Sequence, residues 1–148
     1  MIGLLQRVRS ASVAVAGVVR VEIGPGLLVL VAVETGDGPA QVERLAERLL
    51  GYRVFPDDTG RMNRSLTDTG GELLLVPQFT LAARTDKGNR PGFDGAADPA
   101  LGRLRFDELV AAARQRGARV ATGEFGADMD VALVNQGPVT FWLQVPPG

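Results

Sequence analysis

Two residue types that enzymes often use for catalysis are missing from this chain, which has no cysteine and no histidine among its 148 residues. Without cysteine there is no disulfide framework, no thiol nucleophile and no sulfur-ligated metal site. Without histidine there is no Ser-His-Asp triad, no imidazole base near neutral pH and no histidine-bound zinc or iron. Any hydrolysis by this protein must therefore use other side chains or the backbone.

Long apolar runs and a strong excess of charge are also absent. No run of about 18 apolar residues is present, and Gln6, Arg7 and Arg9 follow the short apolar start, which suits neither a membrane span nor a secretory signal. We therefore expect a cytoplasmic protein with no membrane partner. The net charge of −1 gives no indication of broad nucleic-acid binding, and we expect no DNA partner.

The apolar pattern predicts one strand-rich α/β (α+β) domain over residues 1–148, with two helices packed on a sheet. The helices are expected at residues 39–50 and 99–116, each with a proline at its start and a glycine at its end, and the second is expected to cover another face of the sheet. Its predicted apolar positions are Leu101, Leu104, Leu109, Val110 and Ala113. Strands are expected at residues 1–15, 18–23, 27–33, 52–55, 72–76, 120–125, 129–134 and 140–144.

Two motifs place polar and turn-forming residues directly beside strand-like runs. The first is Pro-Gln-Phe-Thr-Leu at residues 77–81, and the second is Asn-Gln-Gly-Pro-Val-Thr at residues 135–140. Loops held by rigid strands are frequent places for active sites. We therefore expect the functional residues in these two segments.

Thr80 is the one hydroxyl in the first motif, and three interpretations of it stay open. A threonine nucleophile needs an adjacent base, and no histidine is available to serve. Thr80 also suits a structural role as a β-branched residue whose hydroxyl bonds to nearby backbone. In the third interpretation, the N–H groups of Phe79 and Thr80 point into a pocket and stabilise an oxyanion, which suits ester hydrolysis.

The second motif and the segment at residues 82–98 each have two interpretations. Gly137-Pro138 fits an ordinary turn between two strands, and it also fits a cis peptide bond that reorients the backbone. The segment that carries Arg90 and Phe93 is too long for an ordinary connection, so it is either a solvated loop or a substrate loop. Its position just after Thr80 favours substrate binding.

The acidic residues do not have the spacing of a metal site. Asp128 and Asp130 share one strand face without the further carboxylates that a metal cage requires. Asp57 and Asp58 are typical of a turn rather than of a calcium loop. We expect neither a metal nor a cofactor.

Both motifs, at this interval in a chain of this length, closely resemble those of the D-aminoacyl-tRNA deacylases. The resemblance extends over essentially the whole chain, and it includes segments at residues 6–8, 24–30, 51–53, 61–63, 90–93 and 137–143. It implies a barrel-like deacylase fold and a homodimer whose active sites are shared between subunits. It also implies an editing hydrolase that cleaves the ester of D-aminoacyl-tRNA and rejects L-aminoacyl-tRNA.

The resemblance further implies roles for individual residues. Gln78, Phe79 and Thr80 would form the catalytic pocket for the aminoacylated terminal adenosine, with backbone donors and the RNA's own 2′-hydroxyl assisting water. Gly137 and Pro138 would enter the partner's site as a backbone filter against L-amino acids. Other positions are implied by the same resemblance: Pro77, Arg90, Phe93 and Met129 for substrate binding, and Arg7 and Asn135 for support of the Gly-Pro segment.

Two further expectations come with this resemblance. Glycyl-tRNA has no side chain, so it should also be accepted, which implies a role in clearing glycine from alanine tRNA. Pro77 stands where the bacterial family usually has serine, which removes a hydroxyl and a backbone donor.

The alternative function, from another class, is a non-catalytic dimeric module that binds the tRNA acceptor end.

Overall fold

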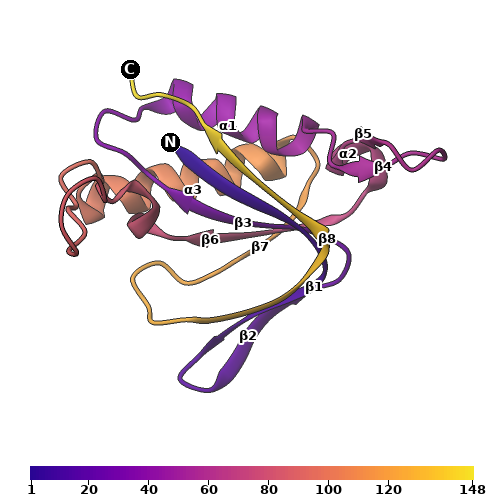
Figure 1. Ribbon diagram of the computed structural model, residues 1–148, viewed down its shortest axis with the longest axis horizontal. Helices are drawn as coiled ribbons and strands as arrows, with labels where there is room; N and C mark the ends of the chain where they lie inside the picture. Colours follow the sequence, from indigo (N-terminus) through magenta and orange to yellow (C-terminus); the bar gives the residue numbers. More distant parts are fainter.

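Eight strands and two long helices make up the computed structural model, which describes residues 1–148 (Figure 1). The strands are β1 Ile2–Val15, β2 Val18–Ile23, β3 Gly26–Ala32, β4 Phe55–Pro56, β5 Met62–Arg64, β6 Glu72–Pro77, β7 Arg119–Thr122 and β8 Asp130–Gln144. The helices are α1 Pro39–Gly51, α2 Leu66–Thr69 and α3 Pro99–Gln115, and a 3-10 turn, η1, spans Phe79–Ala82. The short α2 and η1 were not predicted from the sequence.

The main sheet is built around β1. This strand pairs with β3 through its first half, with β2 through its second half and with β8 along most of its length, always antiparallel. Beyond β3 come β6 and β7, both in parallel. The sheet curls until β2 lies near β6 and β7, as Figure 1 shows. The predicted strand-rich α+β fold with a barrel-like sheet is confirmed.

Strand β3 is buried on both faces, as its continuous apolar run predicts. Leu27, Val29 and Val31 belong to the core beneath the helices, whereas Leu28 belongs to a second core inside the curl of the sheet. At the start of β3 only glycine fits, because a Cβ on Gly26 would lie 1.9 Å from a backbone oxygen of β6. The strand therefore fixes both layers of the molecule.

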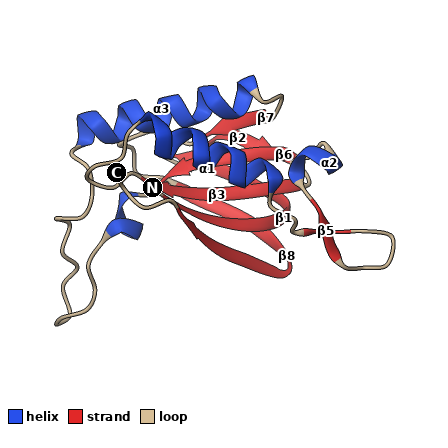
Figure 2. Ribbon diagram, turned by 90° about the horizontal axis from the view of Figure 1, so that it is seen from above, coloured by secondary structure: helices blue, strands red, loops and turns tan.

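The two predicted helices are confirmed to within one residue at their ends. Asp98 caps α3 by accepting a hydrogen bond from the Leu101 N–H at 3.0 Å. The expectation that α3 covers another sheet face was wrong, since α1 and α3 lie side by side on one face and share one core (Figure 2). Leu104 was also wrongly placed in the core: it is 50 % exposed, and Phe106, two residues along and therefore on the opposite side of the helix, is buried.

Four predicted strands differ from the structure. The strand at residues 52–55 is reduced to β4, which pairs only with the short β5, and β7 ends at Thr122 rather than at Phe125. The strands at residues 129–134 and 140–144 are parts of the single strand β8. The chain is not reversed between them, because the residues that look like a turn form a bulge instead.

No helix of the structure is both long and apolar enough for a membrane crossing. No group of three or more acidic side chains gathers where a metal ion would be held.

Candidate active site

A pocket of about 700 Å³ opens at the carboxyl ends of the parallel strands β3 and β6. Its walls come from these strand ends, from η1, from the first half of α3 and from the segment between β7 and β8. Hydrophobic side chains make up 12 of its 19 lining residues, which is typical of a small-molecule site with a few orienting polar groups. Five residues singled out from the sequence line it: Pro77, Gln78, Phe79, Phe93 and Met129.

The turn η1 is attached to β3 by a backbone hydrogen bond. The Gln78 N–H donates to the Val31 carbonyl at 2.7 Å, and the turn closes where the Leu81 N–H donates to the Gln78 carbonyl at 3.2 Å. The N–H groups of Phe79 and Thr80 open the turn, so they have no acceptor within it. The Gln78 amide donates to the Thr80 hydroxyl, and neither group is a base. Thr80 is exposed beside the pocket and is not part of its wall.

The long segment between η1 and α3 forms the outer rim of the pocket and extends away from the sheet (Figure 2). The ring of Phe93 packs against that of Phe79, with centroids 5.2 Å apart. Two backbone hydrogen bonds between Arg84 and Gly92, at 2.7 and 2.9 Å, close the base of the loop. Arg90 is exposed near the loop tip and does not line the pocket, so the structure does not bring it together with the other predicted residues.

Two aromatic side chains that the sequence did not single out complete the pocket wall. Phe106 comes from α3 and Phe125 from the segment after β7, and their ring centroids lie 6.4 Å apart. Met129 lines the pocket beside them, and its Sδ accepts a hydrogen bond from the Glu124 N–H at 3.3 Å. The helical stripe of α3 marks Phe106 as buried, but no local signal places Phe125 against it.

Gly137 and Pro138 lie in a bulge of β8, and both are exposed. The pairing of β8 with β1 shifts here, so that residues 136–139 stand out of the sheet, and we call them the Gly-Pro bulge. The Gly137-Pro138 peptide bond is cis. Only glycine suits the first position, because its φ is +140° and a Cβ would lie 2.7 Å from Cγ2 of Val139.

Arg7 and Asn135 hold this bulge in place. The Arg7 side chain donates from Nε to the Gln136 carbonyl at 3.0 Å and from Nη1 to the Val54 carbonyl at 2.7 Å. The Asn135 side-chain oxygen accepts a hydrogen bond from the Val139 N–H at 2.9 Å. Arg7 and Asn135 thus fix the bulge from both sides, while Gly137 and Pro138 at its centre remain exposed to solvent.

The Gly-Pro bulge and the pocket lie at opposite ends of the sheet. Arg7 pairs with Leu27 at the start of β3, whereas Val31 and Val33 at the other end line the pocket. At about 3.3 Å per strand residue, these points are separated by roughly 13 to 20 Å. Figure 1 shows the same division, with the β4–β5 hairpin at one end and the pocket's rim loop at the other. Within one chain, the two predicted motifs do not meet.

A family model described as D-Tyr-tRNA(Tyr) deacylase matches residues 4–144. The chain belongs to this family. A D-aminoacyl-tRNA deacylase of Methylococcus capsulatus is 63% identical over 147 residues, which cover 99% of this chain and 96% of that protein. A protein of the same name from Nitrosococcus oceani is 61% identical, with coverage of 99% and 95%.

The deacylase family fold is also found among solved structures. The c-Myc DNA Unwinding Element Binding Protein matches with a TM-score of 0.94 at 35% identity, over 99% of each chain. A structure described as a probable eukaryotic D-amino acid tRNA deacylase matches with a TM-score of 0.82 at 19% identity, over 97% of this chain and 98% of the other. The fold is therefore retained where most of the sequence has changed.

Proposed function

We propose that this chain hydrolyses the ester bond that joins a D-amino acid to the terminal adenosine of tRNA, and that the pocket behind Gln78 and Phe79 is its active site. Family membership supports the reaction. The observation that carries the assignment of the site is the turn η1 at the edge of a mostly apolar pocket, because the N–H groups of Phe79 and Thr80 have no acceptor within the turn. Such donors can stabilise the oxyanion of acyl chemistry, and they require neither histidine nor cysteine.

In the proposed reaction, water adds to the ester carbonyl and the N–H groups of Phe79 and Thr80 stabilise the resulting oxyanion. The bond between the carbonyl carbon and the ribose oxygen then breaks, which releases the amino acid and a free hydroxyl on the RNA. The adjacent 2′-hydroxyl assists the movement of the proton. The Thr80 hydroxyl is not the nucleophile in this account, because its hydrogen-bond partner is the Gln78 amide, which cannot remove a proton.

The substrate is held, in this proposal, by the remaining pocket residues. Pro77, Phe93 and Met129 line the pocket and provide apolar contact for the adenosine and the amino acid. Arg90 lies on the exposed rim loop, where a guanidinium suits an RNA phosphate better than the amino acid.

Selection against L-amino acids is assigned to the Gly-Pro bulge of a second subunit. The bulge is too far from its own pocket to contact a substrate there, which supports a homodimer with shared sites. Val134 and Trp142, each 51 % exposed on the outer face of β8, supply apolar surface for such an interface. A fixed backbone excludes the wrong side chain by steric clash rather than by weaker attraction.

Glycyl-tRNA is the proposed second substrate. Glycine has no side chain for the bulge to reject, so the filter cannot separate it from a D-amino acid. We propose that this activity clears glycine mischarged onto alanine tRNA.

One tRNA charged separately with D-tyrosine, L-tyrosine and glycine, at equal enzyme concentration, tests the proposal. The expected result is rapid loss of the D-ester and of glycine, with the L-ester intact. Hydrolysis of all three esters would contradict the backbone filter. Binding without turnover under substrate excess would identify a non-catalytic module for the tRNA acceptor end.

A further inference from the structure

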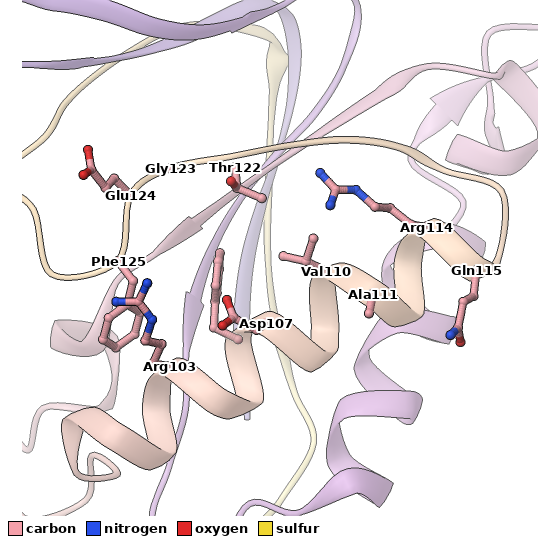
Figure 3. Close-up of a pocket in the computed structure, with 11 residues that line it drawn as sticks. Arg103, Asp107, Val110, Ala111, Arg114, Gln115, Thr122, Gly123, Glu124 and Phe125 are labelled. Atoms are coloured by element: carbon pink, nitrogen blue, oxygen red, sulfur yellow. The ribbon is translucent and has the colours of Figure 1, made fainter.

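A second groove runs along α3 next to the proposed active site. It has a volume of about 640 Å³ and lies between α3 and residues 122–125 (Figure 3). The helix contributes residues from Arg103 to Gln115, a length of about 18 Å at 1.5 Å per residue. Nothing in the proposed reaction uses this groove.

The groove and the active-site pocket share one wall. Phe106 and Phe125 line both cavities, and their tilted rings lie 6.4 Å apart. The groove therefore lies next to the pocket, on the other side of these two rings.

Two arginines project into this groove without an ion pair. The Arg103 guanidinium lies 5.9 Å from the centroid of the Phe125 ring. Arg114, at the far end in Figure 3, donates one hydrogen bond to the Val120 carbonyl at 3.2 Å. Both side chains are exposed, and neither forms a salt bridge, unlike Arg105 on the same helix and Arg116 just after its end. Their other N–H groups are available to an anion.

Two carboxylates and an amide also line the groove. Asp107 lies on α3 between the two arginines, Glu124 lies on the opposite wall, and Gln115 lies beyond Arg114 (Figure 3). A purely anionic ligand would be repelled by Asp107 and Glu124. A nucleotide suits both kinds of group, because its phosphate accepts from arginine while exocyclic amino groups of its base donate to carboxylates. An aromatic ring with an arginine over it is also typical of sites for single-stranded nucleic acid.

We propose that this groove binds the single-stranded RNA that immediately precedes the aminoacylated adenosine, with Arg103 and Arg114 on its phosphates. This inference rests on the proposed function of the pocket. It adds a binding site that orients the RNA, and the groove's residues have no part in the chemistry of the ester.

The test compares two substrates that differ only in the RNA ahead of the ester. One is tRNA charged with D-tyrosine, and the other is 3′-O-(D-tyrosyl)adenosine, which ends where the pocket ends. Arg103→Gln and Arg114→Gln are each measured on both substrates. The matched control is Arg44→Gln on α1, an exposed arginine whose one ion pair is with Glu47 at 3.0 Å.

Each groove variant should lower kcat/KM for the tRNA by about tenfold relative to kcat/KM for the aminoacyl-adenosine, as expected when one charged hydrogen bond is removed. The slope of log kcat/KM against log salt for the tRNA should become shallower by about 0.7 for each phosphate that the protein no longer neutralises. Arg103→Lys should keep the salt slope of the wild type, because lysine keeps the charge, but only part of the activity on tRNA, because lysine does not stack on the Phe125 ring as a guanidinium does. Arg44→Gln should change neither ratio nor slope.

Equal losses of activity on both substrates would show that the arginines only support the pocket wall, and full activity on both would show that the RNA leaves by another path. Each result overturns the proposal. An effect confined to variants of Arg90 would place the RNA over the rim loop instead. If the wild-type chain hydrolyses neither substrate, the proposed function itself fails. This outcome is distinguishable from failure of the groove proposal, because it is seen in the wild type without any variant.

Discussion

The two ends of the sheet are built in opposite ways. At the pocket end, strands of the core stop and Gln78 is attached to β3, so apolar walls enclose a cavity. At the other end, the Gly-Pro bulge projects from β8 with Gly137 and Pro138 exposed, although Arg7 and Asn135 fix its base. The pocket end has a cavity but no projecting segment, and the other end has a rigid projecting segment but no cavity.

In the proposed function, neither end is sufficient alone. Gly137 and Pro138 form a rigid, exposed segment that its own chain holds only at the base, and such a segment can enter a complementary cavity of another chain. We propose that the pocket at the other end is that cavity, and two-fold symmetry would allow two chains to complete each other. Each substitution below changes one end only.

The largest effect is expected from Gly137→Ala. A Cβ here would lie 2.7 Å from Cγ2 of Val139, at a φ of +140° that alanine rarely adopts, so the bulge must shift. Because the proposed bulge lies against the substrate in the partner's pocket, a shift of about 1 Å there misplaces the ester and should lower the rate on D-tyrosyl-tRNA by roughly 100-fold. Steady-state deacylation of D-tyrosyl-tRNA measures this rate. Gly51→Ala is the control, because a Cβ there meets no atom within 4 Å, and an equal reduction in both variants would contradict the account.

A smaller effect is expected from Arg7→Ala. It removes the hydrogen bonds to the Gln136 and Val54 carbonyls, so the bulge loses its anchor on β1 and the free energy of unfolding falls by about 1–3 kcal/mol. Discrimination between D- and L-tyrosyl-tRNA should fall by about tenfold. The control is Arg9→Ala, an exposed neighbour with no side-chain hydrogen bond. Unchanged discrimination in Arg7→Ala would contradict the account, because it would show that the hydrogen bonds of Arg7 do not position the Gly-Pro bulge for the rejection of L-amino acids.

At the pocket end, Thr80→Ala should have a modest effect. The backbone N–H groups remain, and only the hydroxyl that accepts a hydrogen bond from Gln78 is removed. A neutral hydrogen bond of this kind changes kcat/KM by less than about tenfold. Single-turnover deacylation checks this. Near-total inactivation of a folded protein, or a trapped acyl ester on Thr80, would replace the backbone mechanism with a nucleophilic one.

The smallest effect concerns pH at the hairpin beside the bulge. Hydrogen bonds from the Thr59 hydroxyl and N–H lower the pKa of Asp57, and its folded carboxylate is therefore favoured. Its stabilisation is present above the unfolded pKa of about 3.9 and is lost as the pH falls through the folded pKa. The difference in urea midpoint between Asp57→Asn and wild type should be present at pH 7 and should shrink as the pH falls below about 4. A difference in urea midpoint that does not change with pH would show that ionisation of Asp57 does not stabilise the fold.

Much of this difference between the two ends of the sheet could be predicted from the sequence. Helical periodicity with proline and glycine at the ends predicted α1 and α3, and the polar motif after an apolar run predicted that Gln78 follows the end of a strand. For Gly137-Pro138 a turn and a cis peptide bond both stayed open, because bulges and turns use the same residues, and the structure has the cis bond within one strand. Phe106 was missed although its helical spacing marks it as buried, whereas Phe125 was missed because its contact with Phe106 depends on tertiary packing, which leaves no local pattern.

Mixed-subunit complementation tests the central claim most directly. Phe79→Pro removes one of the two proposed oxyanion donors from the pocket and Gly137→Ala shifts the bulge, and each variant alone should keep only about 1 % of the activity on D-tyrosyl-tRNA. When the two are unfolded and refolded together, roughly a quarter of wild-type activity should return, because half of the dimers are mixed and each holds one intact site. No recovery, in a mixture shown to contain mixed dimers, would contradict a site shared between subunits.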